Sequence, residues 1–117
     1  MKKLPRISQK EQDVMFVFWR DGGNMTASAI ADKGDGLGIN TVQAAVRNLL
    51  KKEYIEIADI VYSGTVLTRS YKPVISAEQF AAYQLQILKI NANNFSVSSF
   101  IEHFKANNEI ECFKELT

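Results

Sequence analysis

The sequence is poor in the residue types that build most catalytic and metal sites. Its 117 residues contain one cysteine, Cys112, and one histidine, His103. A lone cysteine excludes an intrachain disulfide, and these two residues cannot supply the four ligands of a structural zinc site. No Ser/His/Asp arrangement or pair of carboxylates indicates catalysis either. We therefore expect a protein that is not an enzyme and that needs no metal or cofactor.

Long apolar runs are absent as well. No stretch approaches the roughly 20 apolar residues that cross a bilayer, and no apolar signal segment follows the basic N-terminus, MKKLPRISQKEQ. The sequence therefore predicts a cytoplasmic protein without membrane contact. The net charge is only +1, but residues 1–75 carry 11 Lys/Arg against 8 Asp/Glu, and residues 76–117 carry 3 against 5. This asymmetry favours polyanion binding by the N-terminal part.

The N-terminal half predicts three helices. Ser8 and Glu11 have the spacing of a capping box at the start of a helix that ends before a glycine pair. Thr26 can cap a short second helix over 27–32. Apolar residues at helical spacing predict a longer third helix over 40–53, with one face towards a core.

The segment that follows predicts a β-hairpin. IEIADIVY and TVLTRSY are rich in β-branched and aromatic residues, and Ser63-Gly64 between them can form a turn. Helix, helix, helix and hairpin is the order of a winged helix. We therefore expect a mostly α fold with a β-hairpin wing, in which residues 1–75 form a winged helix-turn-helix domain.

Three glycines, Gly34, Gly36 and Gly38, precede the third helix. A dinucleotide-binding loop needs a strand before its glycines and G-x-G-x-x-G spacing, and a P-loop needs G-K-[ST]. Here the spacing is G-x-G-x-G after a predicted helix, and the lysine is missing. We interpret the segment as a turn that delivers the third helix.

The face of the third helix that turns away from the core is polar and basic. Amide and guanidinium groups pair with base edges, a small alanine permits close approach, and lysine suits phosphate. An ordinary solvated helix face would also be polar, so the composition alone favours neither interpretation. The residues on this face are Asn40, Thr41, Gln43, Ala44, Arg47, Asn48 and Lys51.

Residues 76–117 predict a helical region. A helix capped by Ser76 runs to about Ile90, and two short amphipathic helices follow an asparagine-rich break. The large apolar side chains of this region are too many for short helices to bury alone, so we expect a homodimer through it. The dimerisation residues are Phe95, Val97, Phe100, Ile101, Phe104, Ile110, Phe113 and Leu116.

Four segments carry a family resemblance: ISQKEQDVMFVFW, TASAIAD, INTVQAAVRNLLKKEYI and SYKPVIS. Together, and in this order, they resemble the penicillinase-repressor family (the BlaI/MecI/CopY group) of bacterial winged-helix transcription regulators. The first is similar to the family's Ile-Ser-x-x-Glu-x-x-Val-Met opening, and the third to its recognition helix with a Leu-x-Lys-Lys ending. They cover most of residues 7–76.

The resemblance implies a homodimeric repressor that binds a palindromic operator in double-stranded DNA, with helix 40–53 in the major groove. It places Thr41, Gln43, Ala44 and Arg47 on the base-reading face and wing contacts near Thr65 to Arg69. The full set of DNA-binding residues that we expect is Asn40, Thr41, Gln43, Ala44, Arg47, Asn48, Lys51, Thr26, Thr65 and Arg69.

Three departures from the family pattern shape the expected regulation. The copper-responsive members carry paired C-terminal cysteines, whereas this chain has Cys112 alone, so we expect no metal sensing. The β-lactam-responsive members are cut at an Asn-Phe bond, and the corresponding place here is His103-Phe104, so we do not expect release by that cleavage. An upstream sensor or protease stays open as a further partner. The wing is longer than usual and carries little positive charge at its tip.

One alternative belongs to another class of function. The winged helix can serve as a protein-interaction module, with the polar face of the third helix merely solvated. Arg47 and the basic N-terminus favour DNA, whereas the weak overall charge favours the alternative.

Overall fold

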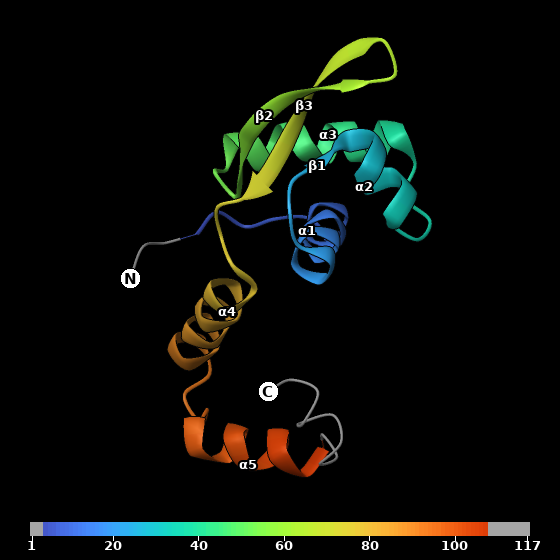
Figure 1. The fold of residues 1–117 in the computed structure, drawn as a ribbon. Coiled ribbons are helices and arrows are strands. Elements are labelled where there is room, and N and C mark those ends of the chain that lie inside the picture. Colours follow the sequence, from blue (N-terminus) through green and yellow to red (C-terminus); the bar gives the residue numbers. More distant parts are fainter. Residues whose placement is uncertain (1–3, 108–117) are drawn as a thin grey trace. The chain divides into compact units, whose positions relative to one another are not determined.

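The structure is a computed structural model and describes residues 4–107. Within this range it contains five helices and a three-stranded antiparallel sheet, which confirms the predicted winged helix (Figure 1). The predicted helix with Ile110, Phe113 and Leu116 lies outside the described residues, as does Cys112. The elements are α1 (Gln9–Asp21), β1 (Met25–Thr26), α2 (Ala27–Lys33), α3 (Ile39–Lys51), β2 (Ile55–Ser63), β3 (Val66–Pro73), α4 (Ala77–Asn91) and α5 (Val97–Asn107).

Helix α1 begins where the capping-box spacing predicted. The Ser8 hydroxyl accepts a hydrogen bond from the Glu11 backbone N–H at 3.2 Å, and the Glu11 carboxylate accepts one from the Ser8 N–H at 3.1 Å. At the other end, Gly22 has φ of 70°, a conformation that costs glycine little, and its N–H donates to the Phe18 carbonyl. Local sequence therefore sets both ends of this helix.

One hydrophobic core joins α1, α2 and α3 to the base of the hairpin. The stripe predicted on α3 lies in it, because Val42, Ala45, Val46 and Leu49 are buried against residues of α1 and α2. The whole cluster is Val14, Met15, Val17, Phe18, Met25, Ile30, Val42, Ala45, Val46, Leu49, Tyr54, Ile55 and Tyr71. The core thus fixes which face of α3 turns outward.

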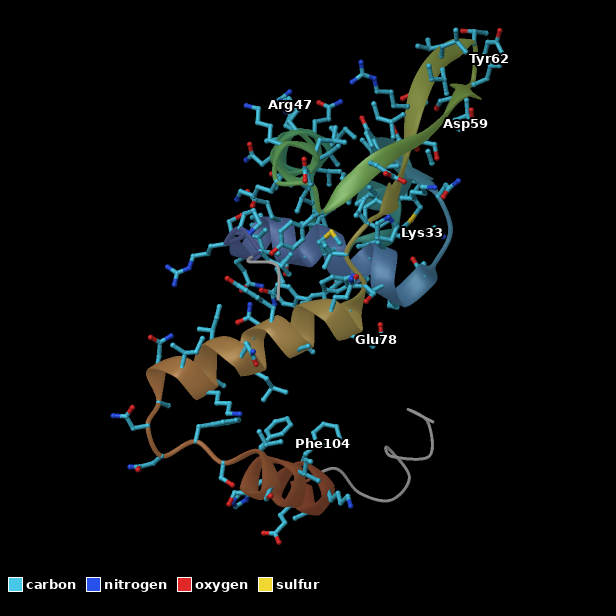
Figure 2. All side chains as sticks on the ribbon, turned by 90° about the vertical axis from the view of Figure 1, so that its left-hand side faces the viewer. Lys33, Arg47, Asp59, Tyr62, Glu78 and Phe104 are labelled. Atoms are coloured by element: carbon cyan, nitrogen blue, oxygen red, sulfur yellow. The ribbon has the colours of Figure 1, made fainter. Side chains whose placement is uncertain are left out.

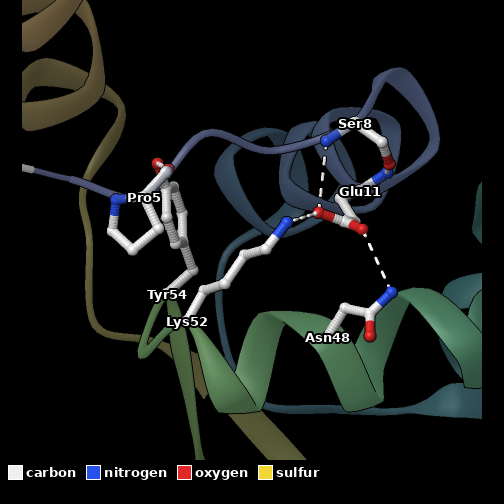
Figure 3. A network of polar contacts seen from close by, with 6 residues as sticks. All are labelled: Pro5, Ser8, Glu11, Asn48, Lys52 and Tyr54. Atoms are coloured by element: carbon white, nitrogen blue, oxygen red, sulfur yellow. Dashed lines mark hydrogen bonds and ion pairs between the residues drawn. The ribbon is translucent and has the colours of Figure 1, made fainter.

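Helix α3 ends at Lys51, earlier than the predicted end at residue 53. Glu53 has φ of 62°, in the left-handed region, so the chain leaves the helix there and enters β2. The turn carries Tyr54 into the core, where its phenol donates to the Pro5 carbonyl at 2.6 Å (Figure 3). The hydrogen bond holds the segment before α1 against the end of α3.

The sheet has the order β1-β3-β2, with β3 in the centre. Strand β1 pairs Met25 with Tyr71 and Thr26 with Ser70, and the sequence did not predict this strand. Two residues are too short to show the alternating pattern that identifies a strand. The hairpin turn lies at Gly64-Thr65, one residue later than predicted.

A β-bulge at Ala58 changes which side chains of β2 share a face. Ile57 pairs with Tyr71 and Asp59 with Ser70, so Ala58 is an extra residue between the two pairs. Because paired residues of antiparallel strands share a face and side chains alternate, Ile57 is followed on its face by Ile60 and Tyr62. We call the resulting surface the wing face; it consists of Ile57, Ile60, Tyr62, Leu67 and Arg69.

The chain divides into two compact units inside α4. The first extends to Phe80 and the second begins at Ala81. The indole N–H of Trp19 donates to the Ile75 carbonyl at 3.0 Å, and the Trp19 ring lies 5.4 Å from that of Phe80, measured between centroids. These contacts bind the first turn of α4 to α1, so the first unit reaches past residue 75, the predicted end of the DNA-binding domain.

Candidate nucleic-acid interface

The glycine-containing segment between α2 and α3 is a tight turn. It follows a helix, so the strand that a dinucleotide-binding loop requires is not there. A Cβ on Gly34 would lie 2.5 Å from Leu37 Cδ1 and 3.0 Å from the Ile30 carbonyl oxygen, and Gly36 has φ of 74°. Steric needs of the turn therefore account for both glycines, and Gly38 forms the N-cap of α3.

The outward face of α3 presents amide and basic groups to solvent. Arg47 lies on the side of α3 away from α1 (Figure 2). Within residues 4–107, neither Arg47 nor Lys51 forms a hydrogen bond or ion pair, so their donors are open to a ligand. Thr41 is half-buried at the edge of this face. The exposed members of the predicted set are Asn40, Gln43, Ala44, Arg47, Asn48 and Lys51.

Three predicted contacts lie outside α3. Thr26 sits at the start of α2, where its hydroxyl accepts the Ala29 N–H at 3.1 Å and caps the helix. Thr65 lies in the hairpin turn, and Arg69 lies on β3 opposite Ile60. Their contact with DNA stays a prediction. The Thr26 hydroxyl is already used as the N-cap of α2.

Asn48 of α3 and Lys52, the C-cap of that helix, are both bound to Glu11 of α1. The Asn48 amide donates to Glu11 Oε2 at 3.2 Å, and Lys52 Nζ lies 2.6 Å from Glu11 Oε1 (Figure 3). Glu11 is only 5% exposed and is the one buried charged residue in the described part of the chain. We call Ser8, Glu11, Asn48 and Lys52 the Glu11 cluster. It joins the N-terminus of α1 to the C-terminal half of α3.

Sequence reasoning assigned Glu11 to the helix cap alone. Its partners on α3 lie 37 and 41 residues further along the chain, so no local spacing indicates them. The available signal was the pair Asn48 and Lys52 itself, two donors four residues apart on one flank of a helix.

The Glu11 carboxyl has a lowered pKa, which makes the stability of the protein depend on pH. Burial raises the pKa of Glu11, but hydrogen bonds from Lys52, the Ser8 N–H and Asn48, with the charge of Lys52, together bring it below the usual 4.5. A carboxyl whose folded-state pKa is lowered stabilises the fold above its unfolded-state pKa, and the contribution is lost as pH falls through the folded-state value. We expect the free energy of unfolding to decrease below about pH 4.5, more steeply in wild type than in Glu11→Gln.

Urea denaturation of both proteins across roughly pH 3 to 6 measures this difference. Parallel pH profiles for wild type and Glu11→Gln would show that the carboxylate adds nothing to stability.

The wing face is exposed and, apart from Arg69, apolar. Ile60, Tyr62 and Leu67 are 60%, 73% and 59% exposed, and Figure 2 shows Tyr62 near the end of the projecting hairpin. Asp59 and Arg69 are the only charged residues between Ala58 and Ser70, and their charges cancel. The wing therefore offers little positive charge to phosphate.

The described part of the second compact unit has little core of its own. Among residues 81–106 no residue is buried. The rings of Phe95 and Phe100 lie 6.1 Å apart and those of Phe100 and Phe104 lie 6.0 Å apart, so they form a row that begins just before α5 and continues along it. Val97, Phe100, Ile101 and Phe104 are 44%, 37%, 45% and 39% exposed. The predicted dimerisation residues of α5 are thus accessible in a single chain.

Within residues 4–107, no three His, Cys, Asp or Glu side chains are grouped so as to hold a metal ion. The helices described there are all too short or too polar to cross a membrane. His103 is exposed on α5.

The three N-terminal helices, the glycine turn and the hairpin define a winged helix-turn-helix domain, a class that commonly presents a helix to DNA. The sequence matches the penicillinase repressor family over residues 7–115. Because the match spans nearly the whole chain, the protein belongs to this family of winged-helix, DNA-binding transcriptional repressors. A search of the curated proteins finds no match.

Proposed function

We propose that this protein represses transcription as a homodimer on a palindromic operator, with α3 in the major groove of each half-site. It acts in the cytoplasm on double-stranded DNA and uses no cofactor. The exposed face of α3 carries the proposal, because Arg47 and its neighbours stand on a helix whose opposite side is fixed in the core.

Each group on this face suits a different part of the duplex. The Arg47 guanidinium can donate to O6 and N7 of guanine together, and the Gln43 amide can pair with adenine. Ala44 lets the helix approach closely, while Lys51 is placed to meet phosphate. Base contacts specify sequence and phosphate contacts fix position, so the two kinds of substitution should differ in their effects.

Arg47→Ala should weaken operator binding by about 1–3 kcal/mol and relax discrimination between sequences. Lys51→Ala should weaken binding to every duplex and make the slope of log K against log salt less negative by about 0.9 per subunit, or about 1.8 for the proposed dimer. Fluorescence anisotropy with the upstream region of the gene and with random duplex, at several salt concentrations, measures both.

Arg20→Ala is the matched control, because it removes an arginine of α1 outside the predicted DNA-binding set. Operator affinity of Arg47→Ala equal to wild type would exclude α3 as the reading helix.

The homodimer is proposed from the second unit. Its α5 residues expose a row of aromatic and aliphatic side chains, and a symmetry-related copy would bury them in an isologous interface. Such a dimer presents two recognition helices to two half-sites, which matches a palindromic operator.

The wing face favours a second candidate function, a protein-interaction module. Ile60, Tyr62 and Leu67 are apolar and highly exposed, and such surfaces mark protein contacts more often than phosphate contacts. Under this alternative, the protein would bind random and upstream duplex equally weakly, and Arg47→Ala would change neither.

A further inference from the structure

Two adjacent lysines at the end of α3 have different environments. Lys51 is exposed on the outward face and has no partner among residues 4–107. The Lys52 side chain is 30% exposed and its ammonium lies 2.6 Å from Glu11, whose side chain is 7% exposed. Although the two lysines are adjacent in sequence, only the ammonium of Lys51 is free to bind a DNA phosphate.

Binding of the Lys52 ammonium to a phosphate costs free energy, whereas binding of Lys51 does not carry this cost. Moving its ammonium away would break a charge-assisted hydrogen bond and leave a nearly buried carboxylate without its cation, which is strongly unfavourable. Glu11 also accepts hydrogen bonds from Asn48 and the Ser8 N–H, so its carboxylate is held in place and cannot follow the lysine outward (Figure 3).

We propose that Glu11 is a positioning residue that limits the sequence-independent part of DNA binding, because it neutralises Lys52 and withholds it from the phosphate backbone. The inference rests on the proposed DNA-binding function. If Glu11 acts in this way, Arg47 and Lys51 are the cations at α3 that contact DNA, and Asn48 holds the helix against α1. The protein consequently binds random DNA less tightly than its count of basic residues suggests.

Glu11→Gln separates the charge of this residue from its shape. The glutamine keeps an oxygen that can accept from Asn48 but no longer neutralises Lys52. In each subunit the freed ammonium should gain one phosphate contact, so the slope of log K against log salt should become more negative by about 0.9 per subunit, or about 1.8 for the proposed dimer. For two salt concentrations that differ fourfold, this change corresponds to about a 12-fold difference in the relative affinity of the dimer.

The test compares wild type, Glu11→Gln and the double variant Glu11→Gln/Lys52→Gln on one random-sequence duplex of about 30 base pairs, over roughly 50–200 mM salt. The double variant has the net charge of wild type and cannot release a lysine. We expect its slope to equal that of wild type and the slope of Glu11→Gln to be steeper. A general loosening of the fold would lower affinity without steepening the slope.

Two results would overturn the inference. One is a wild-type slope for Glu11→Gln, and the other is a slope for the double variant flatter than wild type by about 1.8, which would place Lys52 of both subunits on phosphate in the native complex. Thermal unfolding checks that each variant is folded, and if Glu11→Gln is not, the double variant decides alone.

A separate measurement distinguishes failure of the proposed function from failure of the inference about Glu11. Duplexes selected by the wild-type protein from a random library are titrated with wild type and Arg47→Ala. If wild type prefers no selected sequence but the slopes behave as expected, the proposed operator reading fails and the inference about Glu11 stands. Failure of wild type to bind any duplex would overturn both.

Discussion

A fragment of residues 1–84 is expected to stay folded, to sediment as a monomer and to bind operator on the order of 100-fold more weakly than the full chain. It retains the whole hydrophobic core, the contact of Phe80 with Trp19 and the first half of α4, but loses the rest of α4 and all of α5. Affinity is lost because the fragment cannot dimerise. In the dimer, once one domain is bound, the second domain meets its half-site at an effective concentration near millimolar, and a single domain does not have this advantage.

Sedimentation and operator titration of both proteins measure the effect. In the full chain, Ile101→Glu should have the same consequence, because it places a charge on the exposed apolar row of α5. Ser99→Glu introduces the same residue on the same helix away from that row and serves as the control. A monomeric full-length protein, or a fragment with undiminished affinity, would contradict the dimer mechanism.

Phe18→Ala is expected to lower the free energy of unfolding by about 3–5 kcal/mol. Phe18 is 1% exposed in the centre of the core, so its truncation loses burial and leaves a cavity. Phe16, two residues earlier on α1, is 46% exposed, and Phe16→Ala should cost about 1 kcal/mol or less. Because small domains have only about 5–15 kcal/mol in total, the first variant should be close to unfolding at physiological temperature.

Urea denaturation followed by circular dichroism compares the two variants with wild type. The pair share residue type, substitution and helix, so helix propensity cancels in the comparison and burial is left. Equal costs for Phe16→Ala and Phe18→Ala would contradict the core described above.

The parts of the fold that the sequence predicts well are those determined by neighbours in the chain. The Ser8 capping box and the apolar stripe of α3 depend on residues within a few positions of each other, and both are present as expected. The wing was predictable for the same reason, because β-branched residues on both sides of a glycine turn indicate a hairpin.

The parts that escaped prediction depend on contacts between distant segments. Strand β1 is defined by its pairing with β3, and its two residues carry no pattern of their own. The hydrogen bond from Asn48 to Glu11 joins α3 to α1, and the local sequence, which places Asn48 on the exposed face of α3, does not indicate it. The extra residue at Ala58 became visible only from the register of β2 against β3.

The bulge at Ala58 also bears on how the protein behaves at high concentration. Strand β2 lies at the edge of the sheet, and a long regular edge is a template on which copies of a chain aggregate. The extra residue breaks the regularity of that edge between Ile57 and Asp59, and the Asp59 carboxylate accepts the Ile60 N–H at 2.8 Å. The wing can thus expose apolar side chains on its face, while the bulge disfavours pairing of its edge strand with the edge strand of another copy.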